Sequence, residues 1–291
     1  MSAGADLAIV TNDTSGRGRA AEVVGRLRRA AARRGHVTAE LDADDADATR
    51  AAVAALPDHV RRIVAVGGDG LVHHVIQHLA GTDRELGVVP VGTGNDFAAA
   101  LGIPDDTNAA IEIALGPTQP LDAIRSEHGW AASVATAGFS AVVNATADRI
   151  PLPLGSRIYT AATIVELPRL RSWPAMLTLD GTEVDAETMM LAVANTPRFG
   201  GGMQICPDAD PTDGLLDVTS ISPVSRLTLL RVFPKVFAGE HLDHPAVRTW
   251  RAKEVVVEAA GDLWGDGERM GPSPVRLHAE PGALRVARPR H

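Results

Sequence analysis

Lysine, cysteine and aromatic residues are scarce in this sequence of 291 residues. The two lysines are Lys235 and Lys253, so no glycine-rich loop before residue 235 is followed by the lysine with which a P-loop or a protein kinase holds phosphates. These two classes of ATP-using enzyme are therefore disfavoured. The single cysteine, Cys206, excludes an internal disulfide and a metal site with several cysteine ligands, and we expect a buried apolar side chain there.

The chain also lacks an excess of positive charge and a long apolar run. Its 28 lysines and arginines stand against 36 acidic residues, a net charge of −8, so we expect no nucleic-acid partner held by bulk electrostatics. Any phosphate site must then be local. No run of about 18 apolar residues and no secretory signal pattern occurs, so we expect a cytoplasmic protein. The hydrophobic content of 45% is that of a packed globular chain, with room for two domains.

Three apolar runs are each followed by a glycine-rich loop and then by a helical pattern. The runs cover residues 7–10, 63–66 and 86–91. Continuous apolar runs are typical of strands covered on both faces, and repeated strand-loop-helix units predict a parallel sheet. Residues 1–120 are therefore predicted to form an α/β domain.

Residues 121–291 carry shorter, alternating apolar stretches, which predict a mainly antiparallel β domain. A hairpin is expected between the stretches at residues 176–179 and 189–193, and helices are expected near residues 157–167 and 226–237. The boundary near residue 120 is inferred from the change of pattern alone. The pattern also allows the last strand to return to the first domain.

The three glycine-rich loops are candidates for a phosphate site. In open parallel sheets, ligands bind at the carboxyl ends of the strands, so the loops are expected to converge. They offer backbone N–H groups without Cβ atoms, and Thr14, Ser15 and Thr93 add hydroxyl groups. Arg17 and Arg19 are available as the cations that a P-loop would take from lysine. Taken singly, each loop is more simply a tight turn.

Asp69 stands between glycines directly after a buried strand, beside the expected phosphates. A carboxylate repels phosphate unless a metal lies between them, so we expect Asp69 to face Mg²⁺ directly or through water. Asp69 also precedes a helical pattern, and a helix N-cap is the alternative interpretation. The two roles are compatible.

The tetrapeptide Gly67-Gly68-Asp69-Gly70 and the string PVGTGNDFA at residues 90–98 resemble the diacylglycerol kinase catalytic domain and the bacterial YegS-like lipid kinases. The tetrapeptide also occurs in NAD kinases, whereas the second string is typical of the lipid kinase branch. Further segments are similar to the family: residues 12–16, residues 200–203 with Pro207, residues 213–218, and Asp266-Gly267-Glu268. The resemblance implies an NAD-kinase/diacylglycerol-kinase-like fold, with an N-terminal nucleotide-binding α/β domain, a C-terminal β-sandwich domain and the active site between them.

The resemblance implies a kinase that uses ATP and Mg²⁺ to phosphorylate a lipid hydroxyl, first of all diacylglycerol to phosphatidic acid. The implied nucleotide-binding residues are Asn12, Thr14, Ser15, Gly16, Arg17, Gly67, Gly68, Asp69, Gly70, Thr93 and Asn95. The implied metal site lies at Asp210, Asp213 and Leu215, the first and last through backbone carbonyls. The catalytic candidates are Asp69 with Asp266 and Glu268, and which of the last two accepts the proton stays open.

Several positions depart from the family pattern. Leu71, His73 and His74 replace the usual Thr, Asn and Glu, so a hydroxyl that would bond phosphate is missing and the nucleotide pose is expected to change. We expect a solvated helix position for His73, with phosphate donation as the alternative. His74 and His78 have a spacing that suits a transition metal, although a polar helix face is the simpler interpretation.

A lipid substrate implies contact with a membrane surface, so the resemblance implies a cytoplasmic protein that is transiently peripheral to the inner face of the membrane. With 3% aromatic residues, no strong interfacial helix is evident. The candidates are residues 150–154 and the group Arg169, Arg171 and Trp173, for which an ordinary loop and helix end is the simpler interpretation.

Two other functions stay open. The first is a kinase of the same fold that acts on a sphingoid base, another lipid or a small amphiphilic alcohol. The second is a nucleotide-binding relative without catalytic activity. Asp13, where the family usually has proline, and the residues at positions 71, 73 and 74 favour it, whereas the retained Asp69, Asp213, Asp266 and Glu268 oppose it. The sequence also leaves open a homodimer.

Overall fold

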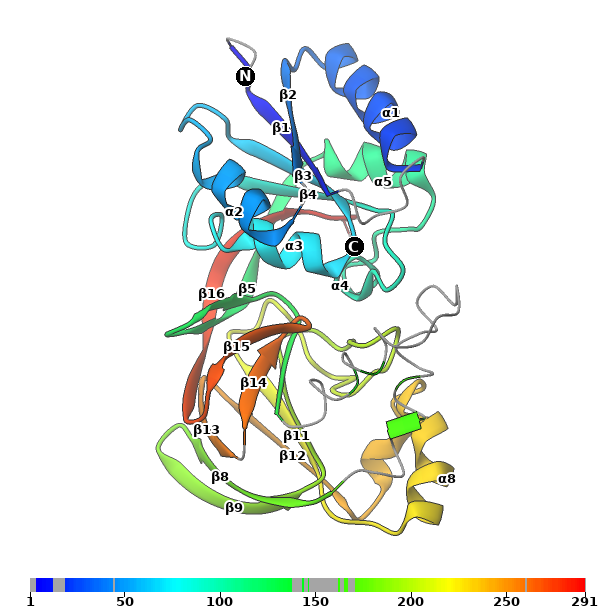
Figure 1. The fold of residues 1–291 in the computed structure, drawn as a ribbon, viewed down its shortest axis with the longest axis vertical. Helices are drawn as coiled ribbons and strands as arrows, with labels where there is room; N and C mark the ends of the chain where they lie inside the picture. The colour runs from blue at the N-terminus through cyan, green and yellow to red at the C-terminus, as the bar shows by residue number, and fades with distance from the viewer. Residues whose placement is uncertain are drawn as a thin grey trace. The chain divides into compact units, whose positions relative to one another are not determined.

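The computed structural model describes residues 4–12, 19–43, 45–137, 143, 146, 162, 165, 166, 171–259 and 261–290 (Figure 1). The chain forms two compact units. Unit 1 is Met1–Leu121 together with Gly282–His291, and unit 2 is Asp122–Pro281.

Unit 1 contains a parallel sheet with the strand order β2-β1-β3-β4. Its strands are β1 (Leu7–Asn12), β2 (Thr38–Ala43), β3 (Arg62–Gly67) and β4 (Glu85–Pro90). The end of β16 (Val275–Ala287) lies parallel to β4, through Arg285 and Val286. Five consecutive residues of β3, and five of β4, are buried, which explains why both strands are continuous apolar runs in the sequence.

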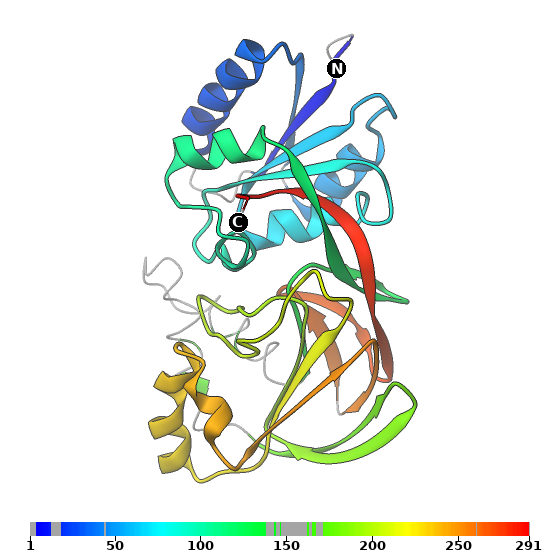
Figure 2. The same ribbon diagram turned by 180° about the vertical axis from the view of Figure 1, so that it is seen from behind.

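The described residues of unit 1 include five helices. They are α1 (Arg19–Arg33), α2 (Ala46–Ala54), α3 (Asp69–Ile76), α4 (Asp96–Ala100) and α5 (Thr107–Ala114). Helix α1 contacts α5, and α2 contacts α3. Figures 1 and 2 show these two pairs on opposite faces of the sheet. Side chains of Asp45 and Asp106 cap α2 and α5 by accepting the N–H groups of Ala48 and Ala109.

Unit 2 contains two antiparallel sheets. The first pairs β16 with β13 (Glu254–Ala259), β13 with β8 (Trp173–Leu179) and β8 with β9 (Thr182–Thr188), while β5 (Thr118–Ser126) pairs with β16 and with β6 (Gly129–Ala131). The second has the order β12-β11-β10-β7-β14-β15. Its strands are β7 (Val134–Ala137), β10 (Met190–Ala194), β11 (Leu216–Ile221), β12 (Val247–Ala252), β14 (Asp262–Gly265) and β15 (Glu268–Pro272).

The core of unit 2 lies between its two sheets. Leu177 and Val255 of the first sheet join Leu191 and Val193 of the second in one buried cluster. The intervening residues of β10, Ala192 and Ala194, belong instead to a second cluster with Cys206 and with α8 (Arg226–Val236). One face of the second sheet therefore fills the sandwich, and its other face is covered by α8 and the segment around Cys206. The predicted α/β plus β-sandwich class is confirmed.

The hairpin in unit 2 differs from its prediction in one respect. Asp180 and Gly181, with φ values of 47° and 85°, form the two-residue turn between β8 and β9. Strand β10 follows β9 directly but pairs with β7 and β11 in the other sheet. Helix α8 lies where a helix was expected, whereas the helix predicted at residues 157–167 falls mostly outside the described residues. No helix in the described part of the chain is long and apolar enough to cross a membrane.

Candidate functional site

Two of the glycine-rich loops meet at the carboxyl edge of the unit 1 sheet. Gly67 and Pro90, at the ends of β3 and β4, are partners in register, so the loops that follow start side by side. A Cβ built on Gly92 would lie 2.5 Å from Cα of Gly68, so the two backbones touch where only glycine fits. The convergence expected for these two loops is therefore present.

Asp69 holds these two loops together. Its Oδ2 accepts the N–H of Asp96 and its Oδ1 accepts the N–H of Phe97, both at 3.0 Å. The carboxylate thus caps the first turn of α4, while Gly68 occupies the N-cap position of α3. The capping role considered for Asp69 is real, but it serves the neighbouring helix. Its expected role towards Mg²⁺ stays a prediction.

Asn95 has a buried amide oxygen that accepts no hydrogen bond from the described residues. The residue adopts a left-handed conformation with φ of 56°, and its Nδ2 donates to the carbonyl of Gly92 at 3.0 Å. Its Oδ1 is buried and has no hydrogen-bond partner among the described residues. A buried acceptor of this kind costs free energy unless a ligand or water donates to it. A Cβ on Gly70 would meet no atom within 4 Å, and Thr93 is exposed, so there is open space beside the loops.

Most of the first glycine-rich loop lies outside the described residues. The backbone of Asn12 ends β1 at the same edge of the sheet. Asp13, Thr14, Ser15, Gly16 and Arg17 lie outside the described residues.

Leu71 packs into the core of unit 1. It is 2% exposed, and its Cδ2 would lie 2.5 Å from a Cβ built on Gly67. The side chain at this position therefore faces an apolar interior, where a threonine hydroxyl would have to find a buried partner.

The histidines of α3 are buried, so the solvated positions expected for them are wrong. His73 is 8% exposed and His74 is 6% exposed. Nδ1 of His74 lies 3.3 Å from Nη1 of Arg50, because α3 packs against α2. Burial, helped by the charges of Arg50 and Arg84, lowers the pKa of His78. The described residues contain no group of three or more His, Cys, Asp or Glu that could hold a metal, so the transition-metal interpretation gains no support.

In unit 2, Asp266 forms the turn between β14 and β15. Asp266 and Gly267 have φ values of 53° and 91°, as a two-residue hairpin turn of this type requires. The Asp266 carboxylate accepts the N–H groups of Ala132, Ser133 and Val134 at 2.7, 2.8 and 3.3 Å. It therefore fastens the hairpin to the start of β7.

Glu268 is the first residue of β15 and is partly exposed. Its position at the beginning of a strand directly after the turn fixes its backbone, because Glu268 pairs with Gly265 across the hairpin. The sequence-predicted element thus contains one carboxylate that accepts three backbone hydrogen bonds and a second one on the adjoining strand.

The predicted metal residues lie in one loop before β11. Oδ1 of Asp213 accepts the N–H of Leu215 at 2.9 Å, and its Oδ2 pairs with Arg251. Oδ1 of Asp210 accepts the N–H of Thr212 at 3.0 Å. The loop is thus folded around its own carboxylates.

Two further residues define the charge around this loop. Asp122 accepts the N–H of Gly214 at 2.7 Å, and Arg251 lies between Asp213 and Asp217. Burial raises the pKa of Asp217; Arg251 opposes this, and the carboxylates of Asp213 and Asp208 add to it. The atoms of this loop that could bind a metal are carboxylate and carbonyl oxygens, which suits a hard cation. Because the described residues hold no cluster of three metal-binding side chains, a cation would need the predicted backbone carbonyls of Asp210 and Leu215 beside Asp213.

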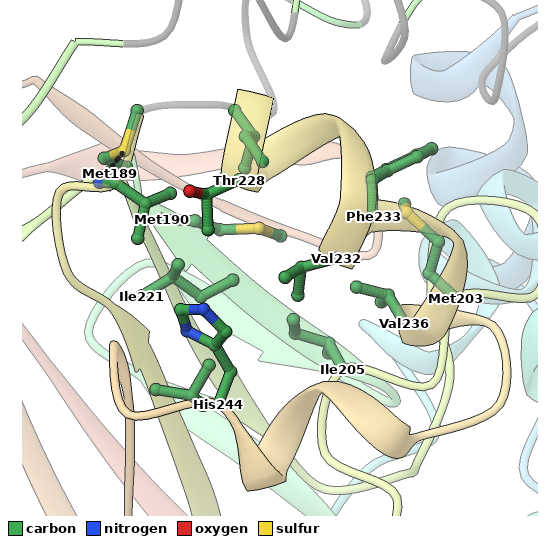
Figure 3. Close-up of a pocket in the computed structure, with 13 residues that line it drawn as sticks. Met189, Met190, Met203, Ile205, Ile221, Thr228, Val232, Phe233, Val236 and His244 are labelled. Carbon is green, nitrogen blue, oxygen red and sulfur yellow. Dashed lines mark hydrogen bonds between the residues drawn. The ribbon is translucent and has the colours of Figure 1, made fainter. Parts of the chain in front are cut away.

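An apolar pocket lies inside unit 2, with a volume of about 50 Å³. Figure 3 shows Val232, Phe233 and Val236 of α8 on one side of it. Ile221 of β11 and Met190 of β10 line the facing side. Methionine side chains adapt to irregular apolar guests, so this pocket suits a flexible hydrocarbon.

Two family models match this chain. The diacylglycerol kinase catalytic domain matches residues 6–126, and the YegS C-terminal NAD kinase beta sandwich-like domain matches residues 133–288. A diacylglycerol kinase of Mycobacterium tuberculosis is 41% identical over 292 residues, which cover 97% of this chain and 94% of the relative. The chain belongs to the diacylglycerol kinase family.

Other known proteins resemble this chain in sequence or in fold. A protein of Xanthomonas oryzae described as a probable lipid kinase, YegS-like, is 33% identical over 263 residues, 84% of each chain. A solved structure of a diacylglycerol kinase from Bacillus anthracis str. Sterne has a TM-score of 0.75 at 18% identity and covers 98% of this chain and 97% of its own. A second structure from the same source reaches a TM-score of 0.81 at 19% identity, and both show the shared fold.

As a member of the diacylglycerol kinase family, the chain is a lipid kinase, a transferase. The family's sequence signature led to Asp69, Asn95, Asp213 and the Asp266 turn, but it did not reveal their partners. Asp122 and Arg251 lie 91 and 38 residues from Asp213 (213 − 122 and 251 − 213), and no local pattern marks them. Asp122 lies on β5 and Arg251 lies on β12, and the pairing that brings these two strands to the loop appears only in the fold.

Proposed function

We propose that this lipid kinase transfers the γ-phosphate of ATP to a hydroxyl group of diacylglycerol, with Mg²⁺, and so forms phosphatidic acid. Relatives named diacylglycerol kinase in Mycobacterium tuberculosis and Bacillus subtilis, 41% and 32% identical, support the choice of substrate. The structural observation that carries the proposal is the contact between the Gly68 and Gly92 loops. We further propose that the protein acts in the cytoplasm, transiently at the inner face of the membrane, where such an acceptor lies.

The nucleotide is assigned to the edge of the unit 1 sheet. Backbone N–H groups of glycine loops and helix starts are suited to phosphate oxygens. Oδ1 of Asn95, which accepts no hydrogen bond from the described residues, could accept one from an N–H or O–H group of the nucleotide. Thr93 offers an exposed hydroxyl. Thr14, Ser15 and Arg17 complete the assigned set from the first loop.

Mg²⁺ would supply charge neutralisation at the transferred phosphate. We assign its protein contacts to the carboxylate of Asp213, to the backbone carbonyls of Asp210 and Leu215, and to the vicinity of Asp69. A single arginine, Arg251, pairs with both Asp213 and Asp217. Negative charge therefore exceeds positive charge at this loop, which supports a cation beside Asp213.

The proton acceptor is assigned to Glu268. In the transfer, the acceptor oxygen bonds to the γ-phosphorus, the bond from that phosphorus to the ADP oxygen breaks, and the hydroxyl proton passes to a carboxylate. The Asp266 carboxylate already accepts three backbone N–H groups and would break them to rotate towards a substrate. Asp266 is therefore proposed to position the hairpin that carries Glu268.

The end of an acyl chain of the acceptor is assigned to the apolar pocket of unit 2. Its lining is almost wholly hydrocarbon and thioether, including Met189, Met203 and Phe233. Burial of each methylene group in such a site is favourable by about 0.8 kcal/mol.

A mixed-micelle assay with labelled ATP and Mg²⁺ tests the proposal. Diacylglycerol, monoacylglycerol, ceramide, sphingosine and a polyprenol are offered separately, with Glu268→Gln as the blank. The wild type with Mg²⁺ is expected to form labelled phosphatidic acid. No such product is expected without Mg²⁺ or with the variant. A labelled product from sphingosine or ceramide alone would replace diacylglycerol as the substrate. ATP binding without a product from any acceptor would contradict catalytic activity on lipids.

A further inference from the structure

Helix α8 exposes two leucines to solvent. Leu227 is 58% exposed and Leu230 is 52% exposed, and they are among four large apolar side chains exposed in the described part of the chain. Residues three and four apart lie on the same side of a helix, so these leucines form a common apolar strip. The whole exposed face of α8 consists of Arg226, Leu227, Leu230, Arg231, Pro234 and Lys235.

The same face is positively charged although the chain is acidic overall. Arg226, Arg231 and Lys235 lie on this face, and none of them forms an ion pair with a carboxylate of the described residues. No acidic residue occurs between Asp217 and Glu240 in the sequence, whereas the whole chain has a net charge of −8. The cationic region is therefore local to α8.

Among the described elements, the 3-10 helix after α8 brings acidic residues to the end of α8. The 3-10 helix η2 (Glu240–Asp243) contacts α8, and both Glu240 and Asp243 are exposed. The charge of Lys235 is thus partly balanced, and the N-terminal part of α8, with Arg226 and Arg231 around the leucines, carries the stronger positive charge.

The opposite face of α8 anchors the helix without help from the leucines. Leu229 and Val236 are buried, and Phe233 is half-buried against the apolar pocket (Figure 3). The side chain of Ser225 caps the helix by accepting the N–H of Thr228 at 3.1 Å. The core of unit 2 therefore does not need Leu227 and Leu230, and their exposure calls for another explanation.

We propose that the outer face of α8 is the surface with which this protein lies on an anionic lipid bilayer. Leucines between cations are typical of helices that rest in the membrane interface, where the apolar side chains enter the acyl region and the cations meet lipid phosphates. At 11 residues the helix is far too short to span a bilayer and suits this parallel orientation. The proposal rests on the lipid-kinase function only in that such an enzyme must reach an acceptor held in a membrane.

The test is sedimentation of the full-length protein with sucrose-loaded vesicles. Phosphatidylcholine vesicles are compared with vesicles that also contain phosphatidylglycerol, at low and at high salt. The wild type is expected to bind the anionic vesicles and to lose most of this binding in high salt. Leu227→Ser with Leu230→Ser should weaken binding at least tenfold. Arg226→Gln with Arg231→Gln should weaken it by roughly 25-fold, since each cation near such a surface contributes about fivefold.

The control variants match the exposure and charge of the test variants. Val37→Ser removes another exposed apolar side chain, 46% exposed in unit 1, and Arg29→Gln with Arg33→Gln removes two exposed cations of α1. Both controls should bind vesicles like the wild type. Unchanged binding in the α8 variants, an equal loss in the controls, or wild-type binding that does not depend on anionic lipid would overturn the proposal.

Kinase activity on a short-chain diacylglycerol in detergent micelles is measured for every variant. All four α8 substitutions should leave this activity and the thermal midpoint unchanged. Vesicle binding without kinase activity in the wild type would overturn the proposed function and leave the α8 surface standing. Kinase activity without vesicle binding would overturn the α8 surface alone.

Discussion

Gly92 touches Gly68 so closely that a Cβ on Gly92 would lie 2.5 Å from Cα of Gly68. Neither residue has a positive φ, so the requirement for glycine here is one of space. The contact joins the loop after β3 to the loop after β4 and sets the spacing of their backbone N–H groups. The phosphate-binding role proposed for this edge therefore depends on a backbone contact.

Gly92→Ala should weaken ATP binding by at least tenfold, because the added methyl group separates the two loops. Calorimetric titration with ATP measures the effect. Gly25→Ala in α1 is the control, since a Cβ there would meet only the end of the Arg29 side chain at 3.6 Å. Equal ATP affinity in both variants would show that the spacing of the loops does not matter for the nucleotide.

Asp69→Asn should abolish turnover and also lower the free energy of unfolding by about 1–3 kcal/mol. The carboxylate accepts the N–H groups of both Asp96 and Phe97, and an amide has only one oxygen to offer them. Urea denaturation monitored by circular dichroism gives the change, with the exposed Asp105→Asn as the control. Lost activity at unchanged stability would mean that Asp69 serves a metal or the substrate alone.

Asp266→Asn and Glu268→Gln should separate positioning from proton transfer. Asn-Gly suits the turn as well as Asp-Gly. Asp266→Asn keeps one oxygen for the N–H groups of Ser133 and Val134 but loses the second oxygen, which accepts the N–H of Ala132, so it should cost about 1–3 kcal/mol of stability. Glu268→Gln should lower kcat by about 10²–10⁴-fold, with a smaller loss of stability than Asp266→Asn. The reverse pattern in denaturation and initial-rate measurements would transfer the role of base to Asp266.

Leu71→Thr should destabilise the protein by about 2–4 kcal/mol without tightening ATP binding. The substitution leaves a cavity beside Gly67 and buries a hydroxyl group. Leu71→Met, which keeps the volume, should cost less than about 1.5 kcal/mol. Tighter ATP binding by Leu71→Thr at normal stability, in paired melting and titration experiments, would place this side chain at the nucleotide.

Cys206 should resist alkylation in the folded protein. Burial raises the pKa of its thiol to about 12, from 9.0, although Thr219 lies 3.1 Å from Sγ. At pH 9 the folded thiol should therefore react with iodoacetamide roughly 10³-fold more slowly than in urea, as mass spectrometry of this single cysteine would measure. Since the unfolded thiol ionises first, stability should fall as pH rises from about 9 to 12 and be unaffected by this group below 9. Rapid labelling of the native protein would contradict its burial.

The sequence predicted those elements whose residue pattern depends on the element alone. Continuous apolar runs revealed β3 and β4, and the spacing of apolar residues revealed α8, because each pattern reflects the burial of a single element. Pairing across the chain could not be predicted in this way. The separation of β9 from β10 into different sheets depends on which core each strand joins.

The same limit applies to the candidate site. The motif pointed to Asp69 and Asp266, but their backbone partners follow from the packing of loops 27 and 134 residues away. His73 and His74 were misjudged as solvated because polar residues on a helix usually face water. Here α2 covers that face, and Arg50 lies beside His74.

Strand β16 has a consequence for how this protein is made. Arg285 and Val286 pair with β4, so unit 1 receives its last strand from residues that follow all of unit 2 in the chain. During synthesis, the edge of the first sheet at β4 stays unpaired until residues 282–287 have been made. A circularly permuted chain that begins near Gly282 would supply that strand first and should shorten this exposed interval.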